Sequence, residues 1–347
     1  MIKQKIFLTI ALSTLLTANA YAIDYSVDDW KFVLDADGMI GFLEPKNDNP
    51  LFISDWEIKT QAIYKFDANS RVGAVYSIDE ECVDDQDYIH DAFAMIENRK
   101  IGRMELGLTH SIARKMGLGL PDVGYLNLNA RSILHDELDL DKVLISDTTA
   151  TTGHDSFRLN LASASTKYGQ YGFSVAGLSD NYNYAIDFAV KIKQPNGKLK
   201  TAYSLALSYM DKPDGFRENT YSPPTVADWR TQMALGINVQ YNSFIWGTSL
   251  RMIYDYNPTT KTADGLMAGT GISYDLLQSS ISLTYMFSDT NLWHHADYNG
   301  QKIDGGDYTN TLVASFRYKY SNNTSLFMSG GLASTTPFFA VGLKSGF

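Results

Sequence analysis

The sequence has a single cysteine and no long apolar run. Because Cys82 is the only cysteine among 347 residues, the chain can form neither an intramolecular disulfide nor a cysteine-based metal cluster. Beyond residue 22 no stretch reaches eighteen consecutive apolar residues, so no transmembrane helix is expected. A glycine-rich nucleotide loop is also lacking. These absences exclude disulfide scaffolds, helical membrane proteins and nucleotide-binding motifs of that kind.

Positive charge is also in short supply. The first 22 residues, MIKQKIFLTIALSTLLTANAYA, combine Lys3 and Lys5 with an apolar run over 6–16 and end in Ala20-Tyr21-Ala22. This pattern predicts a Sec-type signal peptide cleaved after Ala22, since the run is too short to anchor the chain in a bilayer. The expected exported domain, 23–347, then holds 27 Lys and Arg against 39 Asp and Glu, a charge of −12. Such an acidic balance argues against nucleic acid as a partner.

Aromatic residues, in contrast, are abundant and lie in alternating segments. The chain contains 22 Tyr, 17 Phe and 5 Trp, and the segments 56–66, 244–254 and 312–320 alternate apolar residues with charged or small ones. A soluble β-sandwich also alternates, but its apolar face carries aliphatic residues that interdigitate in a core. Here the aromatics gather toward strand ends, as in the girdles of membrane barrels. The segments are therefore interpreted as strands with one lipid-facing side.

The connections support a closed barrel. Short ones at 67–70, 195–198 and 321–324 carry the Asn, Asp, Gly, Ser or Pro of tight hairpins, and longer polar connections fall between them. Counting strands between turns gives sixteen, the first near 29–42 and the last near 337–347. Backbone groups in hydrocarbon need partners, which a closed sheet provides. The sequence predicts an all-β, 16-stranded antiparallel transmembrane β-barrel whose last strand pairs with its first.

Two motifs carry a resemblance to a known family. The segment DAFAMIENRKIGRMELGLTHS (91–111), followed by LPDVG (120–124), resembles the general, trimeric, sixteen-stranded porins of the Gram-negative outer membrane. The resemblance implies a homotrimeric diffusion channel for ions and small hydrophilic solutes, without cofactor or enzymatic activity, in contact with lipid and lipopolysaccharide. It also implies that the closing strand, with Val341, Leu343 and Phe347, is the signal read by the outer-membrane assembly machinery. The alternatives are a porin selective for a sugar, peptide or anion and, less favoured, a barrel enzyme or an adhesin.

The resemblance further implies that a constriction loop, 111–154, folds into the barrel and narrows the pore. An insert of this length is functional or disordered, and a loop lying over the rim is the alternative. Its expected acidic side comprises Asp122, Asp136, Glu137, Asp139 and Asp141. The expected basic side of the constriction comprises Lys31, Lys59, Arg71 and Arg158, and strand parity places Arg103, Arg251 and Arg317 on the lumen face as well. For each of these basic residues the alternative is a solvated charge in the lumen or an ion pair within the wall. The net negative charge favours a channel with a weak preference for cations.

Other polar clusters carry weaker signals. His154-Asp155-Ser156 does not form a catalytic triad, because neighbouring residues on a strand point to opposite faces. The run 79–87 concentrates six acids, of which Asp84, Asp85 and Asp87 are weak candidates for a structural Ca²⁺ or Mg²⁺. A solvated outer loop accounts for the same run, and the resemblance to the porins implies a third reading, a latch onto a neighbouring subunit.

Overall fold

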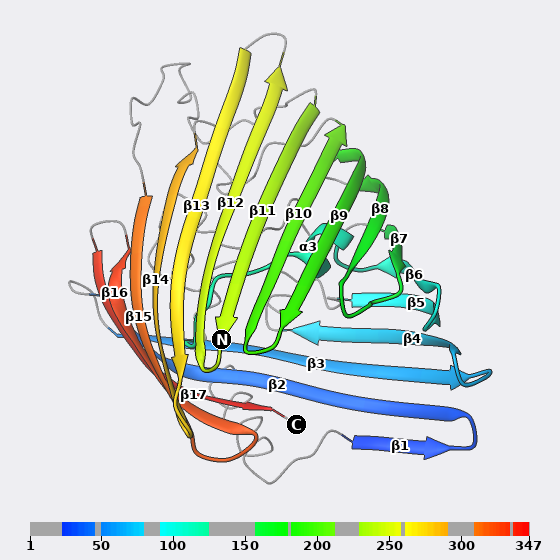
Figure 1. Cartoon of the computed structure of the whole chain (residues 1–347), viewed down its shortest axis with the longest axis horizontal. Coiled ribbons are helices and arrows are strands. Elements are labelled where there is room, and N and C mark those ends of the chain that lie inside the picture. Colours follow the sequence, from blue (N-terminus) through cyan, green and yellow to red (C-terminus); the bar gives the residue numbers. More distant parts are fainter. Residues whose placement is uncertain are drawn as a thin grey trace.

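The protein folds as one antiparallel sheet that closes on itself (Figure 1). The computed structural model describes residues 23–45, 50–79, 91–124, 157–179, 182–211, 229–257, 261–290, 309–333 and 336–346. Its strands are β1 (Ile23–Val27), β2 (Trp30–Pro45), β3 (Leu51–Lys65), β4 (Ser70–Asp79), β5 (Asp91–Asn98), β6 (Gly102–Leu108), β7 (Phe157–Ser163), β8 (Gly169–Ser179), β9 (Tyr182–Asn196), β10 (Leu199–Asp211), β11 (Trp229–Tyr241), β12 (Phe244–Asn257), β13 (Lys261–Asp275), β14 (Ser279–Thr290), β15 (Thr309–Lys319), β16 (Thr324–Ala333) and β17 (Thr336–Gly346). A short helix, α3 (Ile112–Met116), follows β6.

The barrel closes where β17 meets β2. Residues 338–346 of β17 pair with 37–45 of β2, and every other strand from β2 to β17 pairs with its sequence neighbours. The predicted barrel of sixteen antiparallel strands, closed by the last strand, is therefore confirmed.

The short strand β1 was not predicted. It pairs with the beginning of β2, Val27 opposite Trp30, beyond the point where β17 ends. A tight turn at Asp28-Asp29 connects the two strands, and Asp28 has a φ of 51°. Asp tolerates this left-handed conformation better than most residues, which suits it to the turn. β17 pairs with residues 37–45 of β2, and β1 pairs with residues 30–34 of the same edge.

The two faces of the barrel differ as the alternation predicted. Large apolar and aromatic side chains point outward and are exposed, among them Tyr171, Phe188, Leu207 and Tyr274. Their strand neighbours point inward and are small or polar, such as Ser174, Asp187, Ser208 and Ser273. Because the strand period is two, one face suits hydrocarbon and the other suits water. Within the described ranges, no helix has the length and apolar character needed to cross a membrane.

Candidate functional site

The inner wall of the barrel carries an inward segment, which we define as residues 109–124. This segment leaves β6 after Leu108 and forms α3, which packs against β7, β8, β9 and β10 (Figure 1). Ser111 caps the helix by accepting a hydrogen bond from the Arg114 backbone N–H at 3.2 Å. The described part of the expected constriction loop therefore lies inside the barrel, whereas residues 125–154 fall outside the described residues.

Small side chains on the wall make room for α3. Ile112, Ala113 and Met116 are buried against Ala189, Ala206 and Ala234 of three successive strands. Gly172 on β8 is required here, because a Cβ at this position would lie 2.4 Å from Ile112 Cγ1. The helix docks through its apolar side on a wall that larger residues would block.

The segment then continues over the next strands of the wall, from β11 to β15. Asn238 Nδ2 on β11 donates to the Gly119 carbonyl at 3.3 Å, and Thr284 Oγ1 on β14 donates to the Pro121 carbonyl at 3.1 Å. A Cβ at Gly247 would lie 2.6 Å from Pro121 Cδ, so this close approach again depends on glycine. The inward segment thus crosses the strands instead of following one of them.

Asp122 fixes the far end of the described segment. Its Oδ1 accepts hydrogen bonds from Ser282 Oγ at 3.2 Å, Ser315 Oγ at 3.1 Å and the Gly124 backbone N–H at 3.1 Å. Burial raises the pKa of this carboxyl, although the same hydrogen bonds act in the opposite direction. The sequence placed Asp122 among acids displayed to the pore, but the structure shows its carboxylate engaged with the wall.

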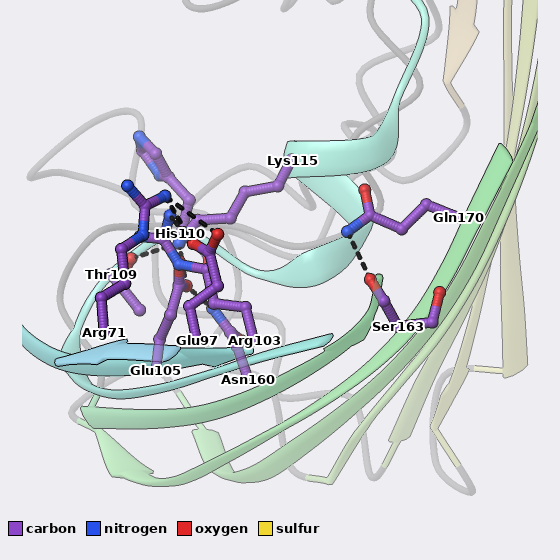
Figure 2. A network of polar contacts seen from close by, with 10 residues as sticks. All are labelled: Arg71, Glu97, Arg103, Glu105, Thr109, His110, Lys115, Asn160, Ser163 and Gln170. Atoms are coloured by element: carbon purple, nitrogen blue, oxygen red, sulfur yellow. Dashed lines mark hydrogen bonds and ion pairs between the residues drawn. The ribbon is translucent and has the colours of Figure 1, made fainter. Parts of the chain in front are cut away.

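Charged residues form a network where the inward segment begins (Figure 2). Arg71 Nη2 contacts both carboxylate oxygens of Glu97, at 2.9 and 2.8 Å. Arg103 Nε lies 2.8 Å from Glu105 Oε1, and the Lys115 ammonium of α3 binds the other oxygen of Glu105. Burial lowers the pKa of Lys115, while Glu105 opposes that shift. For Arg71 and Arg103 the structure shows in-wall ion pairs, one of the two alternatives that the sequence left open.

Aromatic and amide groups complete this network. The Lys115 ammonium lies 4.9 Å from the centre of the Phe93 ring, within the range of a cation–π contact. Asn160 Nδ2 donates to Glu105 Oε2 at 2.9 Å and to the His110 carbonyl at 2.8 Å. The inward segment is therefore tied to the wall by charge at its start and by hydroxyl groups at its end.

Arg158 is fully buried instead of facing the pore water. Its Nη1 lies 3.3 Å from Asp187 Oδ2, and neither side chain has exposed surface. Asp187 also accepts hydrogen bonds from Ser174 Oγ at 2.8 Å and Ser208 Oγ at 2.5 Å. The Ile112 backbone N–H donates to Ser174 Oγ at 3.3 Å, so α3 covers this pair. Arg158 thus supports the helix from the wall and is not displayed as a pore charge.

The other predicted bases are distributed around the wall. Arg251 is buried and donates to Gln232 Oε1 at 3.2 and 2.6 Å, while Arg317 Nη2 lies 3.7 Å from Asp275 Oδ1. Lys31 pairs with Asp24 of β1 at 2.5 Å, and Lys59 stands opposite Asp35 in the β2–β3 register. These residues are not gathered into one basic cluster facing the inward segment.

The last predicted residues belong to the loops and to the closing strand. Outside the described residues lie the loop acids Asp136, Glu137, Asp139 and Asp141, the acids Asp84, Asp85 and Asp87, and the terminal Phe347. Of the closing strand, Val341 and Leu343 point outward, and Lys344 on the other face pairs with Asp37 at 2.6 Å. The roles of these residues in selectivity, cation binding and assembly remain predictions.

Sequence reasoning missed Glu97, Glu105 and Lys115. The two acids share the lumen parity of Arg103, a signal that was present in the alternation. Lys115 lies on a helix that the sequence did not predict. Its pairing with Glu105 depends on where the inward segment packs on the wall. The two-residue period of the strands does not predict that position.

The described residues are close to charge balance. They contain 21 Lys and Arg against 20 Asp and Glu. The remaining residues of 23–347 contain 6 and 19, so the acidic excess belongs to the connections between the described strands. The barrel wall itself does not carry it.

Comparison with known proteins shows the fold and not a sequence family. No protein-family model matches the chain, and no curated protein matches it. Similar solved structures include OmpT, an outer membrane protein of Vibrio cholerae, at 9% identity and a TM-score of 0.67, covering 94% of this chain and 100% of that one. OmpF of Salmonella typhi, in a complex with daunomycin, has 11% identity and a TM-score of 0.64 over 94% and 100%. The anion-selective porin of Comamonas acidovorans has 10% identity and a TM-score of 0.61 over 92% and 100%. The chain therefore has the fold of outer-membrane porins.

Proposed function

We propose that this protein is an outer-membrane porin that lets ions and small hydrophilic solutes diffuse passively through its barrel. The observation that carries the proposal is the inward segment, which crosses the inner wall and is held there at both ends. A barrel that served only as an anchor has no need of an ordered segment inside it. Porin-like folds among the similar structures support the same function.

The oligomer and the location belong to this proposal. An outward face rich in exposed Phe, Tyr and Leu suits the outer membrane of a Gram-negative bacterium. Residues 1–22 are the proposed signal peptide, which directs export and is then cleaved. A homotrimer is the expected assembly, with lipopolysaccharide and the assembly machinery as further partners. Neither a cofactor nor a catalytic step is required for diffusion.

Weak cation preference is the proposed selectivity. The acidic excess lies in the connections, while the described wall is balanced, and the porin resemblance assigns the acids of the pore constriction to Asp136, Glu137, Asp139 and Asp141. We expect neutralisation of Asp136 and Glu137 to reduce the preference for cations, measured as the reversal potential in a KCl gradient.

Recordings in planar bilayers test the proposal. The purified protein is expected to give discrete conductance steps, with closures in threes if three pores assemble. Block by micromolar concentrations of one solute, with little passage of others, would favour a substrate-selective porin. Absence of conductance after verified insertion would contradict the channel and favour an enzyme or adhesin.

A further inference from the structure

The inner wall on the short-turn side of α3 carries lysines that form no ion pair with a carboxylate of the described residues. Lys191 and Lys193 on β9 flank Ile192, which points outward and is 47% exposed, so both lysines face the lumen. Lys191 is half-buried and Lys193 is exposed. Within the described part of the chain, neither side chain forms an ion pair. Two like charges therefore lie close together on one strand face.

The strand neighbours of Lys191 are uncharged. It pairs in register with Gln170 on β8 and with Ser204 on β10. Gln170 Nε2 donates to the Ser163 carbonyl at 2.8 Å and is fixed in this way. The nearest acid along β9, Asp187, is four residues away and is already bonded to Arg158, Ser174 and Ser208. Among the described residues beside it, no acid therefore compensates the charge of Lys191.

Ser204 gives a second and independent indication of a ligand. Its side chain is only 5% exposed, and its hydroxyl has no hydrogen-bond partner among the described residues. Buried hydroxyl groups in native proteins are nearly always bonded, so this hydroxyl is free to donate to a water molecule or to a ligand. Directly opposed residues of antiparallel strands have Cβ atoms about 5 Å apart, which places this hydroxyl beside the Lys191 stem.

The residues that stand opposite these groups on the neighbouring strands are small. Gly236 on β11 stands opposite Ser204, and Ala202 on β10 stands opposite Lys193. Neither residue has a side chain long enough to cover the lysine ammonium groups. Lys200 lies two positions beyond Ala202 on the same strand face and adds a third positive charge toward the mouth.

We propose that Lys191, Lys193 and Ser204 form an anion-binding site for the phosphate or carboxylate group of a small solute. The lysines supply charge as flexible cationic donors, and the hydroxyl donates a directed hydrogen bond. This inference rests on the proposed function, because a solute reaches the site through the pore. A weak site of this kind suits conduction, since the solute must both enter and leave.

Phosphate binding by the detergent-solubilised protein tests the site without requiring conductance. Inorganic phosphate is titrated and its ³¹P line width recorded for the wild type, K191Q/K193Q and S204A. A matched control, K198Q/K319Q, removes the same charge from the β9–β10 turn and from β15. We expect at least fivefold weaker binding for K191Q/K193Q, a two- to fivefold loss for S204A and no change for the control. Equal broadening in the wild type and K191Q/K193Q overturns the proposal, as does an equal loss in the control.

Recordings in bilayers separate this inference from the proposed function. Phosphate added on the side of the short turns is expected to reduce the chloride current of the wild type and of the control, but not of K191Q/K193Q. Replacing phosphate by succinate distinguishes a phosphate preference from carboxylate binding. If the wild type conducts but binds phosphate no better than K191Q/K193Q does, the site is refuted and the channel is not. If the wild type binds phosphate more tightly than K191Q/K193Q but does not conduct, the channel is refuted and the site is not.

Discussion

Asp122 offers the sharpest perturbation of the inward segment. D122A removes the acceptor of two hydrogen bonds from the wall, from Ser282 and Ser315, and of one within the segment, from the Gly124 backbone. At about 0.5–1.5 kcal/mol for each of the two bonds to the wall, docking of the segment should lose about 1–3 kcal/mol. Because each 1.4 kcal/mol is tenfold, the ratio of docked to undocked states falls about 5- to 140-fold.

The raised pKa of Asp122 makes D122N the informative companion. A carboxyl whose pKa is raised in the docked segment favours docking when protonated, so its contribution is fully present below the ordinary pKa of about 3.9. That contribution is lost as the pH rises through the raised value. The neutral amide of D122N keeps an acceptor oxygen and avoids desolvation of a charge, so docking should change by less than about 1 kcal/mol.

Single-channel noise measures the docked fraction. D122A is expected to show larger and noisier conductance at pH 7, whereas D122N resembles the wild type. Acidification should reduce residual noise in the wild type but not in D122N. The reasoning is refuted if D122A is indistinguishable from the wild type, or if D122N is as noisy as D122A.

Three further perturbations test other parts of the account. G247V introduces a side chain where a Cβ would lie 2.6 Å from Pro121 Cδ and should raise conductance noise, while G177A, with open space around it, should not. E105Q removes a charge that binds Arg103 and Lys115. The detergent-solubilised barrel should lose about 2 kcal/mol of stability, measured as a lower midpoint of unfolding. The control is E57Q, at a position opposite Asp37, which should leave the midpoint unchanged. Deletion of Phe347 should impair insertion in cells, assayed by membrane fractionation, much more than it alters the conductance of inserted protein; equal losses of both would contradict its role as an assembly signal.

Periodicity in the sequence was sufficient to predict the barrel. Alternation over segments such as 244–254 places side chains on opposite faces by geometry alone, so the strand count and the closing strand followed. The short strand β1 escaped prediction because five residues, Ile23–Val27, are too few to show a clear period. Its signal was the Asp28-Asp29 turn.

The site was less predictable because side-chain pairing depends on register. The alternation along the strands placed Arg71 and Arg158 on the inner face. It does not show that Glu97 neutralises Arg71 or that α3 covers Arg158. The role of Asp122 as an anchor depends on Ser282 and Ser315, about 160 and 190 residues further along the chain. Only closure of the barrel brings such residues together.

Substituted-cysteine modification tests most directly whether current flows through the barrel lumen. In a Cys82→Ser background, K193C places a thiol on the inward face of β9, and I192C places one on the adjacent outward face. A charged methanethiosulfonate reagent should change the single-channel conductance of K193C and leave that of I192C unaltered. An unchanged conductance for K193C after verified modification, or an equal change for both, would contradict a pore lined by the inner wall.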